Sequence, residues 1–170
     1  GRNDFNPTGN LEFNAPPAYT VGLQKYNFKL LNLANNHAMD QGKAGLDNTR
    51  TFLNSLGITV IGTGNNLDEA WQGKIVENHA IKIGFIGASY SSINDGGRAT
   101  NNYVARIEDT ERLKNSIALL KPYCDYIVVT MHAGTEYTRA PNEEQIVFAH
   151  TAIDSGADMV IGAHPHWVQT

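Results

Sequence analysis

Cysteine, runs of positive charge and long apolar stretches are all scarce in this sequence, and each scarcity narrows what the chain can be. Cys124 is the one cysteine, so the chain cannot form an internal disulfide bond. It lies in an apolar stretch and is interpreted as a small buried hydrophobic residue. The 13 lysines and arginines are scattered, and the net charge is -4. We therefore expect no nucleic-acid partner, because neutralising phosphates requires clustered cations.

No apolar stretch is long enough to cross a membrane, and no signal peptide is recognisable. The chain opens on Gly1 without an initiator methionine and ends at Thr170, just after a His-Pro-His sequence. We interpret it as a piece or a processed product of a longer protein. The hydrophobic fraction of 41% and the length of 170 residues are typical of one globular domain. We therefore expect residues 1–170 to form a single domain, truncated at both ends.

Apolar residues recur along the chain with the spacings of strands and helices in alternation. This alternation indicates a mainly parallel sheet covered by helices on both faces, which is an α/β fold. A tight turn at Asn78-His79 predicts one antiparallel hairpin. Residues 89–103 are rich in Ser, Asn and Gly, which predicts a long surface loop. The expected strands are 29–34, 58–61, 74–77, 81–86, 125–131 and 157–161, and the expected helices are 45–56, 67–71, 108–120 and 142–155.

Two of these elements carry more detailed expectations. The helix at 142–155 has Ile146, Ala149, His150 and Ile153 three or four positions apart, which predicts that this stripe faces the core. The strand at 157–161 is expected to be buried. His150 would then be a packing residue. His79, in the hairpin turn, is expected to be exposed and without a direct role.

Side chains that can bind metal follow three of the predicted strands directly. The first strand runs into Asn35-Asn36-His37, the strand at 125–131 runs into His132 to Glu136, and the last strand runs into His164-Pro165-His166. Ligands of parallel α/β sheets bind outside the carboxyl ends of the strands, so we expect these clusters to meet. Imidazole nitrogens with amide and carboxylate oxygens suit zinc, manganese or iron. The sequence therefore predicts a metal site at this edge of the sheet.

The backbone of the last cluster, His164-Pro165-His166, is expected to be extended. Pro165 holds it out of a helix. Residues two apart in an extended stretch point to the same side, so His164 and His166 are expected to reach one pair of metals together. Each histidine alone could instead be a hydrogen-bonded residue at a strand end. The three clusters taken jointly favour metal.

In combination, these clusters resemble the signature blocks of bacterial capsule-synthesis proteins of the CapA type, which are associated with poly-gamma-glutamate. The resemblance runs through nearly the whole chain, and its motifs are specific in combination. The matching stretches are Leu33-Ala34-Asn35-Asn36-His37-Ala38-Met39-Asp40-Gln41-Gly42, His132-Ala133-Gly134-Thr135-Glu136-Tyr137, Gly156-Ala157-Asp158-Met159-Val160-Ile161-Gly162-Ala163-His164-Pro165-His166, Phe13-Asn14-Ala15-Pro16-Pro17 and Gly62-Thr63-Gly64-Asn65.

The resemblance implies a fold similar to the calcineurin-like metallophosphoesterases and a site for two divalent metals. Carried over by motif, the ligands of one metal would be Asn36, His132 and His164, and His166 would hold the other. His37 would be the catalytic residue beside them, as a donor to the leaving group or a stabiliser of developing charge.

Four further residues near these motifs have expected roles. Asn35 and Glu136 would bind substrate or support the ligands from behind. Asp40, with Gly42, is expected to shape the loop into the next helix and to cap that helix.

The sequence departs from the family pattern in its carboxylates. A two-metal site needs carboxylates that bridge the ions, and the superfamily supplies them from aspartate segments upstream of the Asn-His block. This chain has no such segment. Asn10-Leu11-Glu12 resembles the Asn-Leu-Glu block of the family, but it stands closer to Phe13-Asn14-Ala15-Pro16 than that block usually does. We therefore expect half of a metal site in this chain.

Three functions remain open at this point. The first is a metal-dependent hydrolase of an ester, phosphoester or amide, tied to capsule or poly-gamma-glutamate synthesis, export or anchoring. The second is a subunit without catalysis that binds an anionic cell-surface polymer within a membrane-bound capsule machine. The third is a generic phosphoesterase, which fold analogy alone supports. The resemblance also implies a location outside the cytoplasm, tethered by a membrane segment that is not in this chain.

Overall fold

The protein is described here by a computed structural model, which covers residues 12–92 and 101–169. Asn10 and Leu11 of the Asn-Leu-Glu block, and residues 93–100 of the predicted surface loop, lie outside the described residues. Every predicted strand and helix is present, with ends shifted by a few residues. The elements are η1 (Pro17–Thr20), α1 (Val21–Lys25), β1 (Leu30–Asn32), α2 (Gly42–Ser55), β2 (Thr59–Ile61), α3 (Leu67–Ala70), β3 (Lys74–Asn78), β4 (Ile81–Ser89), α5 (Thr110–Leu120), η3 (Lys121–Tyr123), β5 (Tyr126–His132), α6 (Glu143–Asp154) and β6 (Met159–Ala163).

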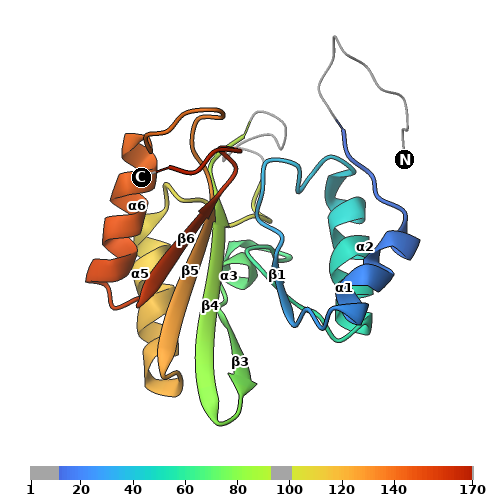
Figure 1. The fold of residues 1–170 in the computed structure, drawn as a ribbon, viewed down its shortest axis with the longest axis horizontal. Coiled ribbons are helices and arrows are strands. Elements are labelled where there is room, and N and C mark those ends of the chain that lie inside the picture. Colours follow the sequence, from blue (N-terminus) through green and yellow to red (C-terminus); the bar gives the residue numbers. More distant parts are fainter. Residues whose placement is uncertain (1–11, 93–100, 170) are drawn as a thin grey trace.

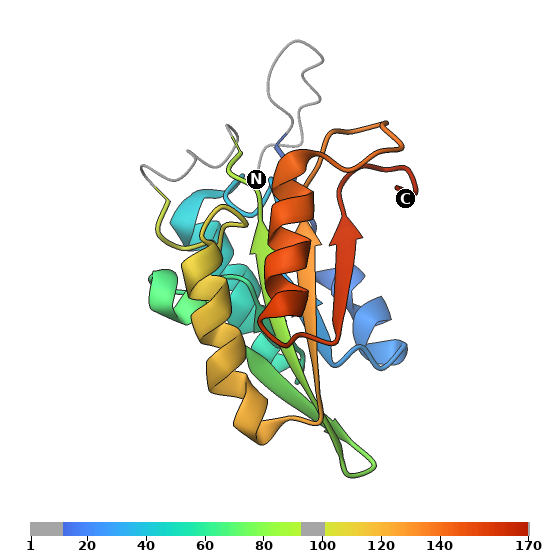
Figure 2. The same cartoon turned by 90° about the vertical axis from the view of Figure 1, so that its left-hand side faces the viewer.

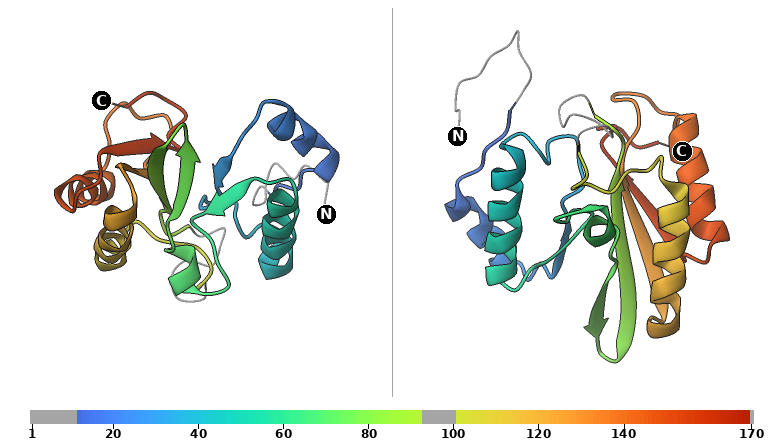
Figure 3. Two further views of the ribbon diagram at one scale, coloured as in Figure 1. Left: turned by 90° about the horizontal axis from the view of Figure 1, so that it is seen from below. Right: turned by 180° about the vertical axis from the view of Figure 1, so that it is seen from behind.

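The described strands form two sheets, and the predicted α/β class with mainly parallel strands is confirmed. One sheet pairs β1 with β2 in parallel, and the other has the order β3-β4-β5-β6. In the larger sheet only the β3–β4 hairpin is antiparallel. The helices α5 and α6 cover one face of the larger sheet, and the small sheet with α1 and α2 lies against its other face (Figure 1). The result is an α/β sandwich of four layers (Figure 3).

The two sheets approach each other closely at a glycine. A Cβ on Gly87 of β4 would lie 2.4 Å from Asn32 Oδ1 of β1 and 3.1 Å from Ile61 Cγ1 of β2. Only a residue without a side chain lets the backbones of the two sheets come this close. This contact brings the carboxyl ends of β1 and β4 to the same side of the molecule.

The principal core lies between the larger sheet and the helices α5 and α6. Helix α5 begins at Asp109, whose side chain accepts a hydrogen bond from Arg112 N, and it buries Leu113, Ile117 and Leu120 at helical spacing. Strand β5 alternates buried and partly buried residues, with Val129 fully buried. A smaller core of Leu53, Ile58 and Val60 lies between α2 and β2.

Helix α6 corrects the predicted core stripe. It begins with a capping box between Asn142 and Gln145, and its buried residues are Gln145, Phe148 and Ala152. Of the predicted stripe, only Ala149 packs against the core; Ile146 and Ile153 are 41% and 47% exposed, and His150 is exposed as well. The larger Phe148 side chain decides which face is buried, since it removes more apolar area from water.

Strand β6 corrects a second expectation. It is largely exposed, with Met159 at 53% and Ile161 at 48%. Among the described strands it pairs only with β5, so one of its edges is open, and α6 covers only one of its faces (Figure 2). A strand at a sheet edge keeps much of its surface in water even when its sequence is apolar.

The prediction of a surface loop at 89–103 is wrong at the two ends of that range. Ser89 belongs to β4, and Ser92 and Asn101 are buried. Bridges from Thr63 to Val104 and from Ser89 to Arg106 hold the returning chain against the sheets. Within residues 12–92 and 101–169, no helix has the length and apolar character needed to cross a membrane.

Candidate metal site at the strand ends

The three predicted clusters lie together at the carboxyl ends of β1, β5 and β6. His132 Nε2 is 3.0 Å from Asn36 Oδ1, although 96 positions separate the two residues in sequence. The rings of His132 and His164 have their centroids 4.8 Å apart, and those of His164 and His166 are 6.2 Å apart. Four of the predicted ligands, contributed by both sheets, are therefore neighbours, as parallel strand ends require.

The turn after β1 is built by its own asparagines. Asn35 Oδ1 accepts a hydrogen bond from His37 N at 2.8 Å, and Asn35 Nδ2 donates to Leu33 O at 3.2 Å. Such an Asx turn reverses the chain just after the strand and buries Asn36, which is 8% exposed. Both polar atoms of the Asn35 side chain are used within the turn. This favours a supporting role for Asn35 over direct contact with substrate.

The His-Pro-His segment does not have the extended backbone that was predicted. His164 has φ +99° and His166 has φ +60°, and both belong to a bend after β6. A left-handed conformation is costly for a residue with a Cβ, and such strain is concentrated at functional sites. The His164 side chain is buried at 6% exposure, whereas that of His166 is 59% exposed.

Glu136 lies beside both of these histidines. Its Oε1 is 4.0 Å from His164 Nε2 and 3.8 Å from His166 Nε2. The two imidazoles therefore both lie next to the Glu136 carboxylate. Left-handed bends, and not an extended backbone, bring them there. Glu136 brings a carboxylate next to His164 and His166. A role in substrate binding or ligand support stays a prediction.

His37 is held by a buried carboxylate that was predicted to have another role. Asp40 Oδ2 is 2.9 Å from His37 Nδ1 and accepts a second hydrogen bond from Phe13 N at 2.6 Å. The Asp40 side chain is 4% exposed. The expectation that Asp40 caps the next helix is wrong, because Gln41 is the N-cap of α2 and makes no capping bond with its side chain. The Phe13 ring meets the His37 ring edge-on, with the ring centroids 4.4 Å apart. Asp40 and Phe13 thus hold the His37 ring from two sides.

Burial sets the charge of the central histidines. Burial, and to a smaller extent the neighbouring His164, His37 and His166, together lower the pKa of His132 to about 4. Burial also lowers the pKa of His164, against an opposing effect of the Glu136 carboxylate. Both rings are therefore neutral at pH 7. A neutral imidazole presents the lone pair with which histidine binds a metal.

The donor set fits a borderline divalent metal in chemistry. It offers the Asn36 amide oxygen, neutral imidazoles and the Glu136 carboxylate, which are ligand types of zinc, manganese and iron. No group of three His, Cys, Asp or Glu side chains within residues 12–92 and 101–169 is already gathered closely enough to hold an ion. A metal would therefore have to draw these side chains inward.

Two aromatic residues at the site were missed by the sequence reasoning. Tyr90 follows β4 directly, and its ring centroid lies 4.9 Å from that of His164. Tyr137 follows Glu136 and stacks on His166 at 5.5 Å with an interplanar angle of 19°. Tyr90 stands at the end of a fourth buried strand, so the same strand-end pattern could have identified it.

Two cavities open next to the site. A groove of about 730 Å³ is lined by His132, His164 and His166 together with Ile146, Trp167 and Val168. A second groove of about 820 Å³ has His37 in its wall and runs beneath residues 13–17 along α2. The lining of the second groove contains amides and apolar groups, with His37 as its one residue that can carry charge.

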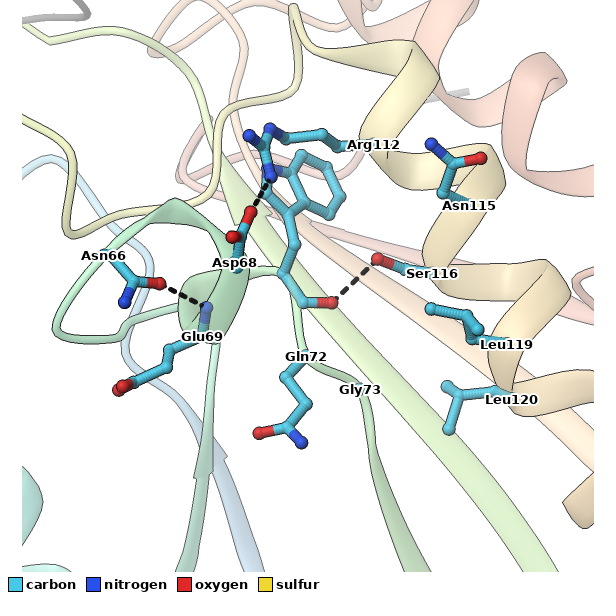
Figure 4. A pocket seen from close by; sticks show the side chains of 11 residues that line it. Asn66, Asp68, Glu69, Gln72, Gly73, Arg112, Asn115, Ser116, Leu119 and Leu120 are labelled. Carbon is cyan, nitrogen blue, oxygen red and sulfur yellow. Dashed lines mark hydrogen bonds and ion pairs between the residues drawn. The ribbon is translucent and has the colours of Figure 1, made fainter.

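A third cavity, of about 660 Å³, lies between α3 and α5 (Figure 4). Asp68 and Arg112 form an ion pair in its wall, and Ser116 Oγ donates to Trp71 O at 2.7 Å. It shares no lining residue with the histidine cluster. The two remaining histidines also lie outside the cluster: His79 is exposed in the hairpin turn, as predicted, and His150 is exposed on α6.

Comparison with known protein families gives one match along the whole chain. A sequence model of the family described as bacterial capsule synthesis protein PGA_cap matches residues 1–170. The PGA biosynthesis protein CapA of Bacillus subtilis (strain 168) is 32% identical over 146 residues, which cover 85% of this chain and 38% of that protein. The capsule biosynthesis protein CapA of Bacillus anthracis is 24% identical over 168 residues, which cover 95% of this chain and 40% of that protein. The chain thus spans about two fifths of the length of these relatives.

A solved structure shares the fold. It is a candidate 5′-nucleotidase from Staphylococcus aureus in complex with alpha-ketoglutarate, and it superposes with a TM-score of 0.58 at 18% sequence identity. The match covers 86% of this chain and 31% of that chain. Likeness at this identity shows the fold alone, an α/β sandwich.

Proposed function

The chain belongs to the bacterial capsule synthesis protein family PGA_cap, and from this premise we propose that it forms part of a metal-dependent hydrolase acting in capsule or poly-gamma-glutamate synthesis, export or anchoring. The observation that carries the proposal is the meeting of Asn36, His132 and His164. The Asn36 oxygen is 3.0 Å from His132 Nε2, and the two histidine rings are 4.8 Å apart. Neutral imidazoles that converge with an amide oxygen at strand ends are suited to a borderline metal.

In this proposal, Asn36, His132 and His164 hold one divalent ion, and His166 holds a second. Manganese, zinc and iron are the candidates. When bound, such ions would supply Lewis-acid polarisation of a carbonyl or phosphoryl oxygen. Glu136, close to both His164 and His166, orients these rings or the substrate.

His37 is the catalytic residue of the proposal. Its Nδ1 is engaged by the Asp40 carboxylate at 2.9 Å, so Nε2 is the ring atom that can reach a leaving group. A protonated His37 donates its proton from Nε2 to the departing oxygen or nitrogen. Asp40 and the edge-on Phe13 ring keep the imidazole in this orientation, which lowers the entropy lost when the reacting groups align.

Family membership supports a proposal for the partners, to which we add one for the location. The substrate class is an anionic cell-surface polymer or a phosphoester, and the protein works beside membrane-bound subunits of capsule synthesis. We place its action outside the cytoplasm, at the bacterial cell surface, tethered by a membrane segment that is not in this chain. Accessibility of the native protein to an added protease on intact cells tests this location.

Metal analysis with variants tests the site itself. The purified protein is reconstituted with manganese, zinc or iron, dialysed, and analysed for metal content and for hydrolysis of a chromogenic phosphodiester and of poly-gamma-glutamate. Bound metal and turnover in the wild type, both lost in His132→Ala and His164→Ala, are expected. His79→Ala, in the exposed hairpin turn, is the matched control and should behave as wild type. Equal losses in all three variants would overturn the proposal.

A second candidate is a polymer-binding subunit without catalysis. The observation that favours it is the set of exposed aromatic side chains beside the cluster, since Tyr137 is 60% and Trp167 is 48% exposed. Polymer binding without metal and without turnover would select this candidate. Metal-dependent turnover of the phosphodiester alone, with no effect on the polymer, would instead select a generic phosphoesterase.

A further inference from the structure

The segments that follow β5 and β6 run side by side (Figure 2). Tyr137 N donates to Pro165 O at 2.8 Å, which joins the two segments directly. Their exposed side chains form a continuous group, which we call the aromatic rim and define as Tyr137, Arg139, His166 and Trp167. The rim lies beside Glu136 and the His-Pro-His bend, so a molecule bound on it would be next to the candidate metal site.

The rings of the rim are ordered against one another. Tyr137 stacks on His166 at 5.5 Å and meets Trp167 edge-on at 6.5 Å. Arg139 Cζ lies 5.0 Å from the centroid of the Trp167 ring. Tyr137 and Trp167 nevertheless keep 60% and 48% of their surface in water. Grouped exposed aromatic surface of this kind marks a place where a ligand or partner binds.

The backbone beneath the rim is strained and firmly braced. Tyr137 has φ +59°, a left-handed value that is unusual for a bulky aromatic residue. Gln169 Nε2 donates to Thr138 Oγ1 and to Ala140 O, both at 3.1 Å. Gln169 Oε1 accepts from Gln145 Nε2 at 2.9 Å, and Gln145 is buried at 2% exposure. This amide network holds the rim in one shape, and strain of this kind is found in ligand clamps.

Arg139 gives the rim its charge preference. Within the part of the chain that the structure describes, no carboxylate lies within ion-pair distance of this exposed guanidinium. Its face packs on Trp167, which leaves the N–H groups at its edge available for a carboxylate. A neutral sugar would use the rings without the cation. A polymer that alternates flat amide groups with carboxylates would use both.

We propose that the aromatic rim is a binding subsite for an anionic polyamide, a glutamate polymer. The rim directs the bound polymer toward the histidine cluster. Amide planes pack on Tyr137 and Trp167, and a carboxylate of the polymer pairs with Arg139. From Trp167 the groove of about 730 Å³ continues to His164. This assignment rests on the proposed function, which takes the capsule glutamate polymer as the substrate class.

The two tryptophans of the chain provide a direct readout. Trp71 is 3% exposed and its Nε1 has no hydrogen-bond partner, so Trp71→Phe removes the buried signal without breaking a hydrogen bond of the indole. In this background, Trp167 fluorescence is titrated with poly-gamma-glutamate of defined length and, in parallel, with neutral dextran. The glutamate polymer is expected to give a saturable change and to protect Trp167 from quenching by acrylamide. Dextran is expected to give neither effect.

Variants then test the individual contacts. Arg139→Gln and Tyr137→Asn should each weaken polymer binding roughly tenfold, the effect of losing one charged or aromatic contact. Asn is chosen because it tolerates the left-handed backbone at this position. Tyr123→Ala is the matched control, since Tyr123 on η3 is 67% exposed and lies outside the rim. Circular dichroism establishes that each variant is folded.

The outcomes separate the subsite from the catalytic proposal. Weaker binding in both rim variants, with or without hydrolysis, supports the subsite. Wild-type affinity in both, equal binding of dextran, or no binding of the polymer by the wild type overturns it. If the rim variants bind the polymer as tightly as the wild type and still hydrolyse the phosphodiester with metal, the subsite is refuted. The catalytic proposal then still stands.

Discussion

Asp40 carries a carboxylate at 4% exposure, and its two hydrogen bonds explain how that burial is tolerated. Its Oδ2 accepts from the backbone N–H of Phe13 and faces His37 Nδ1, so the buried oxygen has two hydrogen-bond partners. A buried carboxylate that is hydrogen-bonded to a histidine fixes the orientation of that ring, and it contributes little to the free energy of unfolding. The residue thus has the geometry of a positioning group for His37.

Asp40→Asn should therefore lower turnover roughly a hundredfold, with little change in KM, because the ring of His37 loses the group that orients its proton. The measurement is kcat and KM on whichever substrate the wild type hydrolyses. Asp47→Asn is the control, since the Asp47 side chain is 41% exposed and pairs with Lys43 on the surface of α2. Equal turnover in the two variants would refute the positioning role.

The depressed pKa of His132 predicts how the metal-free protein responds to acid. Its pKa in the folded state is about 4, below the ordinary value of 6.5. Between these values the unfolded chain binds a proton that the folded chain does not, so the free energy of unfolding falls as the pH drops from 6.5 toward 4. The lowered pKa of His164 acts in the same direction.

Urea unfolding in the presence of a chelator at pH 7.5, 6 and 5 measures this effect. We expect His132→Gln to flatten the dependence of stability on pH in that window, because glutamine does not titrate. His79→Gln, in the exposed hairpin turn, should leave the slope as it is in the wild type. A wild-type slope in His132→Gln would mean that other groups cause the acid sensitivity.

At the scale of single residues, the sequence predicted which polar groups lie close together but not how they are held. Asn36, His132 and His164 follow apolar runs that are recognisable as strands, so their meeting follows from sheet topology. The role of Asp40 depends on a contact with Phe13, 27 positions away, which no local pattern reveals. The left-handed bends at His164 and His166 are likewise set by their surroundings, because the local preference of histidine is against them.

At the scale of helices and strands, the sequence predicted the type and position of each element. It predicted less well which side of an element is buried. Helix α6 offers two apolar stripes, one with Ile146 and Ile153 and the other with Phe148 and Ala152. Both have helical spacing, so periodicity cannot choose between them. The choice is made by the fit of Phe148 against the sheet. Strand β6 shows the same limit, since an apolar strand at an open edge has the composition of a buried one.

The orientation of α6 leads to a stability prediction. Phe148→Ala should lower the free energy of unfolding by about 3 kcal/mol or more, because it leaves a cavity in the principal core. Ile146→Ala removes a side chain that is 41% exposed, so it should cost less than about 1 kcal/mol. Urea unfolding monitored by circular dichroism gives both values. A larger loss in Ile146→Ala would mean that the helix is rotated from the orientation described.

At the scale of the whole molecule, the candidate ligands belong to two sheets, and within residues 12–92 and 101–169 the strands of one sheet do not pair with those of the other. Asn36 follows β1 of the small sheet, whereas His132 and His164 belong to β5 and the segment after β6 of the larger one. The packing of these sheets could not be predicted from the sequence, because it depends on the close approach at Gly87 rather than on any periodic pattern. An α/β class was predictable from the alternation of elements alone.

A metal held between the two sheets should therefore stabilise the protein as one unit. Because an ion that binds only the folded state adds RT ln(1 + [L]/Kd), a concentration of about one hundred times Kd should add about 2.7 kcal/mol. Thermal unfolding with added manganese, zinc or iron measures this gain, and native-state hydrogen exchange should show slower exchange in β1 and β5 together. His132→Ala should abolish both effects, and His79→Ala should retain them. Slower exchange confined to β5 and β6 would place the ion on the larger sheet alone and remove Asn36 from its ligands.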